Sequence, residues 1–141
     1  MRKRRVVFVT GTRADFGKLK PLLQTAVETV NVDLSIFVTG MHMFERYGST
    51  WLEVVKAGFT NVHPFVNQGD NDSMAAVLGK TVTGFSDYIA EVHPDLIVVH
   101  GDRVEAFACA AAGLLSDIPI AHVEGGEVSG TVDEALRPAI S

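Results

Sequence analysis

Three acidic residues fall at positions where a carboxylate could act as an acid or a base. Asp102 follows the apolar segment at residues 96–100, and Glu124 follows the next apolar segment at residues 118–123, with Asp133 in the stretch beyond. Carboxylates that share a site raise one another's pKa values, which suits general acid–base catalysis. A structural interpretation stays open, because Asp102 and Asp133 also stand where residues cap helices.

Basic residues gather at a second place, in the stretch VTGTRADFGKLKP at residues 9–21. The stretch does not match a P-loop, because its glycines are one residue too far apart and Leu19 stands where a hydroxyl must reach magnesium. Arg13 also interrupts the dinucleotide-binding pattern. What remains is the N-terminus of a predicted helix beside Arg13 and Lys18. These residues are explained equally well as an anion-binding site and as two solvated surface charges.

Histidine and cysteine give weaker signals. Cys109 is the single cysteine of the chain, so no disulfide forms within it, and a buried inert thiol is expected. His100 and His122 stand at strand ends, where a hydrogen-bonded histidine is commoner than a catalytic one. The other histidines are scattered and expected to be solvated: His42, His63 and His93. No spacing indicates a zinc site or a nucleophile–base pair, so no metal is predicted.

Alternating apolar and amphipathic segments must position these residues. Apolar segments rich in β-branched residues predict strands at residues 5–10, 33–39, 60–66, 96–100 and 118–123. Helical spacing predicts helices at residues 16–30, through Trp51 to Gly58, at 73–92 and at 103–115, with Asp15 as a cap of the first, Pro21 near its first turn or at a kink, and a further helix beginning near Asp133. This alternation predicts an α/β fold, a parallel sheet with helices on both faces.

The polar segments follow the strands of this predicted sheet. They occupy residues 11–18, 40–42, 101–103 and 124–133. Ligands of such sheets bind beyond the carboxyl ends of the strands, so one site is expected to contain the basic residues and the carboxylates.

Composition narrows the classes of protein. The 141 residues fit one domain, and a net charge of -5 argues against nucleic acid as a partner. No apolar stretch reaches the ~20 residues that a membrane span needs, and the N-terminus lacks the apolar core of a signal peptide, so the cytoplasm is expected. The chain stops about two turns after the start of the last predicted helix, which predicts a domain of a longer protein.

Several segments together resemble a known family. GTRADFGKLKPLL, VTGMHMFERYGST, HPDLIVVHGDRVEAFACAAA and IPIAHVEGGEVSGTVDEALR are similar to the N-terminal half of UDP-N-acetylglucosamine 2-epimerases, and most similar to the hydrolysing branch of sialic-acid and related nonulosonate synthesis. The resemblance implies that residues 1–141 form a Rossmann-like domain, the N-terminal half of a two-domain GT-B architecture. The C-terminal UDP-binding half would then be absent from this sequence.

The resemblance also implies a reaction and a set of residues. The family converts UDP-N-acetylglucosamine to N-acetylmannosamine and UDP, by elimination of UDP and addition of water, without a cofactor. Asp102, Glu124 and Asp133 match catalytic carboxylates of the family, with their individual roles left open. Substrate-binding roles are implied for Arg13, Lys18, Arg103 and Glu127, the two cations Arg13 and Lys18 near the diphosphate. A homo-oligomer is implied for the full-length protein.

Alternatives stay open within this resemblance. A hydrolysing enzyme acting on UDP-N,N′-diacetylbacillosamine would carry the same segments. The non-hydrolysing branch is disfavoured by EGGEVSGT, where that branch usually reads more like EAGLR. Pro138 departs from the hydrolysing pattern, which commonly has histidine after the arginine. A different class of function, a non-catalytic anion-binding module, is expected for the 141 residues in isolation, since one wall of the cleft would be missing.

Overall fold

The fold is a parallel sheet, seen in a computed structural model that describes residues 3–44, 48–69 and 71–123. Within these residues five strands lie in the order β3-β2-β1-β4-β5, and every neighbouring pair is parallel. The strands are β1 (Arg4–Thr10), β2 (Val32–Val38), β3 (Val62–Pro64), β4 (Leu96–His100) and β5 (Ile120–Val123). The helices are α1 (Arg13–Glu28), the 3-10 helix η1 (Gly40–Met43), α2 (Trp51–Lys56), α3 (Met74–Val92) and α4 (Val104–Leu115).

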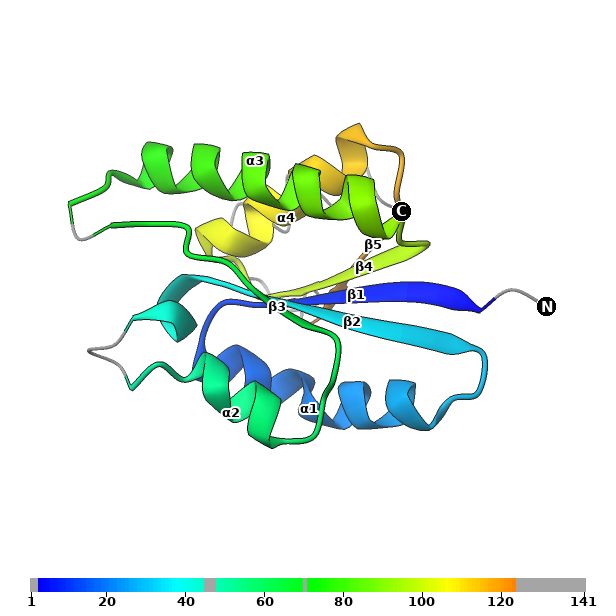
Figure 1. Ribbon diagram of the computed structural model, residues 1–141. Helices are drawn as coiled ribbons and strands as arrows, with labels where there is room; N and C mark the ends of the chain where they lie inside the picture. The colour runs from blue at the N-terminus through cyan, green and yellow to red at the C-terminus, as the bar shows by residue number, and fades with distance from the viewer. Residues whose placement is uncertain (1–2, 45–47, 70, 124–141) are drawn as a thin grey trace.

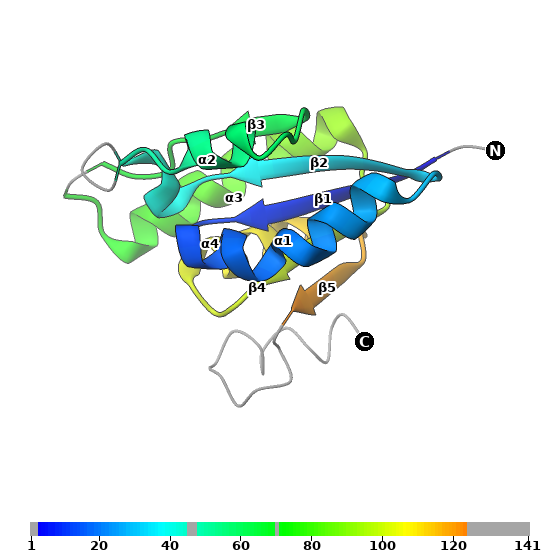
Figure 2. The same ribbon diagram turned by 90° about the horizontal axis from the view of Figure 1, so that it is seen from below.

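The helices form a layer on each face of the sheet. In Figure 1, α3 and α4 lie above the strands while α1 and α2 lie below them. Figure 2 shows α1 running along β1, the strand at the middle of the sheet. Because both faces are covered, the strands read as continuous apolar runs and not as an alternating pattern. The predicted fold class is therefore the observed one.

The core on the side of α3 and α4 combines aromatic and very small residues. The ring of Phe37 lies 4.9 Å from that of Phe85 and 5.1 Å from that of Tyr88, between centroids. On α4, a Cβ at Gly113 would come within 2.6 Å of the Ile120 side chain and 2.7 Å of that of Ile97. The absence of a side chain at Gly113 therefore lets α4 pack directly on β4 and β5.

The opposite core holds α1 against the sheet. Leu19 and Leu23 are fully buried on the inner side of α1. Phe16 meets Phe59 edge to face, with ring centroids 6.1 Å apart. Burial of each such side chain contributes about 2 kcal/mol, so this apolar stripe fixes the position of the helix and of the residues at its N-terminus.

The start of α1 differs from the prediction. The helix begins at Arg13 and its cap is Thr12, whose hydroxyl accepts a hydrogen bond from the backbone N–H of Asp15 at 3.0 Å. The Asp15 side chain, predicted to be the cap, instead accepts from the N–H of Gly11 at 3.1 Å. Thr12 and not Asp15 caps the helix because the Thr12 hydroxyl reaches the N–H three residues on, while the Asp15 carboxylate is engaged by Gly11. Pro21 lies inside the helix and not in its first turn.

Proline also sets the limits of other elements. β3 ends at Pro64, which has no N–H for a ladder bond, and β5 begins just after Pro119. Both strands are therefore shorter than predicted. α3 ends at Val92, and its C-terminal cap His93 adopts a left-handed conformation with φ 53 just before Pro94. The helix predicted near Asp133, and Pro138, lie outside the described residues.

Candidate active site

The carboxyl ends of the strands are tied together by their loops. Gly11 follows β1, and its carbonyl accepts from the N–H of Met41 at 2.8 Å, while the carbonyl of Thr10 accepts from the N–H of Thr39 at 3.0 Å. Gly40 adopts φ +65, a conformation that favours glycine. The loops after β1 and β2 are thus joined into one platform beside the N-terminus of α1.

A carboxylate and an imidazole pair on the same platform. Asp15 Oδ1 lies 2.7 Å from His100 Nδ1, and both side chains are nearly buried, at 13% and 11% exposure. A carboxylate accepts only, so Nδ1 of His100 is the donor of this hydrogen bond. The pair joins α1 to the end of β4, where the strand order reverses and ligands of such sheets bind.

His42 is buried on this platform, which corrects the expectation that it is solvated. Its Nε2 lies 2.9 Å from the Thr10 hydroxyl and its Nδ1 lies 2.9 Å from the Thr50 hydroxyl. Thr10 donates its own proton to the Thr12 carbonyl, so it accepts from Nε2. Burial lowers the pKa of His42 to about 4, so the imidazole is neutral at neutral pH and serves to join the loops.

Asp102 and Arg103 lie between β4 and α4. Both are exposed, and they follow Gly101, which adopts φ +76. His122 of β5 holds this turn, since its Nε2 lies 2.5 Å from the Gly101 carbonyl. Arg103 is the N-terminal cap of α4, and its Nε lies 3.1 Å from Oε1 of Glu105. The predicted acid and the predicted cation are therefore both at the expected edge.

The two cations of α1 that were predicted to bind substrate, Arg13 and Lys18, are both exposed. Arg13 is the first residue of the helix, and its side chain, 75% exposed, pairs with Glu53 of α2 at 3.3 Å. Lys18 is also exposed. Arg13 and Arg103 thus stand at the ends of helices that lie on opposite faces of the sheet. Asp102 is the one predicted acid among the described residues, and the described partner of Arg13 is Glu53 instead.

The remaining predicted site residues, Glu124, Glu127 and Asp133, lie outside the described residues. What the structure does describe is the strand pair that precedes them. β4 and β5 are neighbours, and His100 is opposite Val123 in their register. The proximity of Asp102 and Glu124 remains a prediction.

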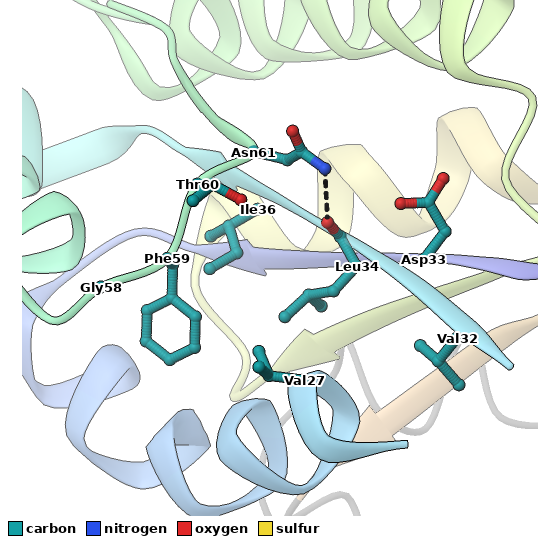
Figure 3. A pocket seen from close by; sticks show the side chains of 9 residues that line it. All are labelled: Val27, Val32, Asp33, Leu34, Ile36, Gly58, Phe59, Thr60 and Asn61. Carbon is teal, nitrogen blue, oxygen red and sulfur yellow. Dashed lines mark hydrogen bonds between the residues drawn. The ribbon is translucent and has the colours of Figure 1, made fainter. Parts of the chain in front are cut away.

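A pocket of about 260 Å³ lies away from this edge. Figure 3 shows it between the end of α1 and the amino-terminal half of β2, with the Asn61 side chain donating to the Leu34 carbonyl at 3.2 Å. Its lining is Val27, Val32, Asp33, Leu34, Ile36, Gly58, Phe59, Thr60 and Asn61. None of these is a candidate for chemistry, so we place the site by its polar residues and not by this pocket.

Two classes of site are absent from the described part of the chain. No group of three or more histidine, cysteine or acidic side chains is arranged there to hold a metal ion. Within the same residues, no helix has both the length and the apolar character of a membrane span.

Sequence reasoning did not identify the pairing of Asp15 with His100 or the burial of His42 and Glu105. Asp15 and His100 are 85 residues apart, so no local spacing joins them. The available signal was topological: Asp15 follows β1 and His100 ends β4, and both strands were predicted to end at the same edge of the sheet. For Glu105 the only signal was its place in the first turn of an otherwise alanine-rich helix.

Known proteins are similar to this chain in sequence and in fold. The chain is 48% identical over 138 residues to a UDP-N-acetylglucosamine 2-epimerase of Neisseria meningitidis serogroup B, a match that covers 98% of this chain and 37% of the relative. It is 40% identical over 141 residues to the UDP-N,N′-diacetylbacillosamine 2-epimerase (hydrolyzing) of Legionella pneumophila, with coverage of 98% and 37%. The chain thus spans little more than a third of the length of these curated relatives.

The crystal structure of UDP-GlcNAc 2-epimerase from Neisseria meningitidis, bound to UDP-GlcNAc, superposes with a TM-score of 0.78 at 22% identity, over 96% of this chain and 37% of that one. At this identity the likeness shows the fold, and the predicted Rossmann-like half of a GT-B architecture is confirmed. The sequence model of the family described as UDP-N-acetylglucosamine 2-epimerase matches residues 25–141. The chain belongs to the UDP-N-acetylglucosamine 2-epimerase family.

Proposed function

We propose that the chain is the N-terminal domain of a hydrolysing UDP-N-acetylglucosamine 2-epimerase, which converts its substrate to N-acetylmannosamine and UDP. The observation that carries the proposal is the 48% identity to an epimerase along nearly the whole chain, together with the placement of Asp102 and Arg103 at the carboxyl edge of the sheet. A second domain would close the cleft and bind much of the UDP. We extend the proposal to a homo-oligomer in the cytoplasm.

The proposed reaction needs no oxidant or reductant. A base removes the proton at C2 of the sugar while the bond between C1 and the UDP oxygen breaks, which leaves a C1–C2 double bond. Water then adds its oxygen to C1, and a proton returns to C2 from the opposite face. Asp102, Glu124 and Asp133 share these proton transfers in the proposal.

Basic groups have a separate task in the proposed site. Charge accumulates on the diphosphate as the C1–O bond breaks, and fixed positive charge at that point lowers the barrier. Arg13, Lys18 and Arg103 supply it, with the N-termini of α1 and α4 directed at the same edge of the sheet. Glu127 is proposed to contact the substrate as well.

The sugar has a second candidate. The 40% identity to a relative that acts on UDP-N,N′-diacetylbacillosamine favours this substrate as the alternative. In isolation the 141 residues are proposed to bind an anion without turnover, because one domain cannot exclude water from the reacting sugar.

UDP release by the complete gene product tests the proposal, with each of the two UDP-sugars supplied in turn. We expect release from one of them, and Asp102→Asn is expected to abolish it while the circular dichroism spectrum stays unchanged. Asp117→Asn is the matched control, since Asp117 is exposed and has φ 59, which asparagine tolerates. Near-normal turnover by Asp102→Asn would refute the catalytic role of Asp102.

A further inference from the structure

Glu105 is a buried carboxylate that the proposed reaction does not use. It lies in the first turn of α4 and is 2% exposed. Its Oε2 is buried and makes no hydrogen bond to any residue that the structure describes. Burial of a charge is costly unless a partner compensates it. An apolar side chain of similar size would fill this space without that cost, so the carboxylate requires another explanation.

Two glycines make room for this carboxylate. A Cβ at Gly11 would come within 2.8 Å of Glu105 Oε1, and a Cβ at Gly40 would come within 2.6 Å of the same oxygen. At such distances a neighbour must shift, so the absence of side chains at Gly11 and Gly40 lets the loops after β1 and β2 lie close to the start of α4 without displacing the carboxylate. Glu105 therefore lies where three loops of the candidate site meet.

The described partner of the carboxylate is Arg103. Its Nε donates to Glu105 Oε1 at 3.1 Å, while the Arg103 side chain remains 45% exposed. A guanidinium is planar with its donors in a fixed fork, so an acceptor at Nε fixes the plane and leaves the two terminal nitrogens to bind an anion. An exposed arginine without such an acceptor samples many rotamers, and ordering it costs binding free energy.

We infer that Glu105 is a positioning residue, which holds the Arg103 guanidinium ready for the diphosphate of the UDP-sugar. The inference rests on the proposed function and deepens it, because it states how one substrate-binding cation is ordered before the substrate arrives. Glu105 does not touch the substrate. Its effect on the reaction passes through Arg103 alone.

A double-mutant cycle in the complete gene product tests this, with KM and kcat measured by UDP release. Glu105→Leu keeps an apolar filling and removes the acceptor, and it is expected to raise KM about tenfold with a smaller fall in kcat. Glu105→Gln keeps an acceptor oxygen, and its KM is expected to stay within about threefold of the wild type. In an Arg103→Ala background, Glu105→Leu is expected to change KM no further.

Each other outcome decides against the inference. An equal rise of KM on Glu105→Leu with and without Arg103 would assign Glu105 a purely structural role, as would a Glu105→Gln variant as impaired as Glu105→Leu. If Glu105→Leu does not fold, the KM of Glu105→Gln is the deciding measurement, and a rise of more than about threefold contradicts the inference. Glu91→Gln, which removes an exposed charge of α3, controls for charge. A wild type that releases no UDP from either sugar overturns the proposed function itself and the inference with it.

Discussion

Asp15 Oδ1 and His100 Nδ1 are 2.7 Å apart, although 85 residues separate them in the chain. Asp15 also accepts from the N–H of Gly11, so one carboxylate joins the loop after β1, the start of α1 and the end of β4. These three segments meet where the strand order reverses. The pair therefore fixes the geometry of the edge at which ligands of this fold bind.

Asp15→Asn is expected to lower the free energy of unfolding of the chain by about 2 kcal/mol, because two partners lose a charged acceptor at a nearly buried site. Urea unfolding followed by circular dichroism measures it. The double variant with His100→Gln is expected to lose less than the sum of the single losses. Asp87→Asn, on the exposed side of α3, is the control and is expected to change stability by less than about 0.5 kcal/mol. Additive losses would mean that the two side chains do not interact.

The buried His42 predicts a specific response to pH. Burial lowers its pKa from 6.5 to about 4. Between these pH values His42 binds a proton in the unfolded chain and not in the folded chain. The free energy of unfolding therefore falls as the pH is lowered from 6.5 towards 4, and the full contribution of His42 is present above pH 6.5. The contribution is about 3 kcal/mol. Urea unfolding of His42→Gln at pH 7 and pH 4.5 is expected to show a smaller difference than the wild type.

The control for this pH dependence is His93→Asn. His93 is exposed, and its left-handed conformation suits asparagine. If this variant flattens the pH dependence as much as His42→Gln does, the response does not arise from His42.

Gly40→Ala is expected to destabilise the chain by more than about 3 kcal/mol. The new Cβ would come 2.6 Å from Glu105 Oε1 and 2.7 Å from the Gly11 carbonyl, in a backbone with φ +65. Gly58→Ala is a matched control, since φ is +99 there with no atom within 4 Å of the new Cβ. That variant carries only conformational strain, about 1–2 kcal/mol. Equal losses by the two variants, compared by thermal unfolding, would show that neither the contact with Glu105 nor that with the Gly11 carbonyl is important.

Cys109 is a probe of unfolding. It is fully buried, and burial together with the charge of Glu105 raises the pKa of its thiol well above the usual value. We expect no reaction with a chromogenic thiol reagent in the native chain, and a reaction in urea at the rate of unfolding. Because the chain has one cysteine, the signal is unambiguous. Fast stoichiometric labelling without denaturant would contradict this burial.

Arg13→Ala separates binding from stability. The pair with Glu53 is exposed and contributes less than about 1 kcal/mol, so the unfolding midpoint of the variant is expected to stay close to that of the wild type. KM for the UDP-sugar in the complete gene product is expected to rise about tenfold. Glu53→Gln breaks the same pair but keeps the cation, and its KM is expected to be nearly unchanged. A parallel rise in both variants would assign the effect to the pair.

Strands and helices were predictable from the sequence where burial alone defines them. β4 matches its predicted limits, because an apolar run lies between Pro94 and a glycine. The start of α1 was not predictable from the sequence, because Thr12 and Asp15 are both good helix caps. Only the three-dimensional position of Gly11 decides between them. Local chemistry therefore determined the elements and left the side-chain partners of their ends undetermined.

The location of the candidate site, at the carboxyl edge of the sheet, was predictable from the sequence. The set of residues at that site was only partly predictable. Parallel strands bring their carboxyl ends together, which placed Asp102 and Arg103 correctly at that edge. His42 was expected in solvent, because nothing in its neighbourhood in the sequence indicates that hydroxyls from β1 and from the loop before α2 enclose it. Partners of this kind depend on contacts between distant segments, which a single sequence does not reveal.

Gly113 has a consequence for the orientation of α4. It lies near the far end of α4, in contact with the sheet, while Arg103 and Glu105 stand at the opposite end of the same helix. A methyl group at Gly113 would require either the Ile97 and Ile120 side chains to shift or this end of α4 to move away from the strands. The orientation of Arg103 at one end of α4 therefore depends on how closely the other end of the helix packs on the sheet.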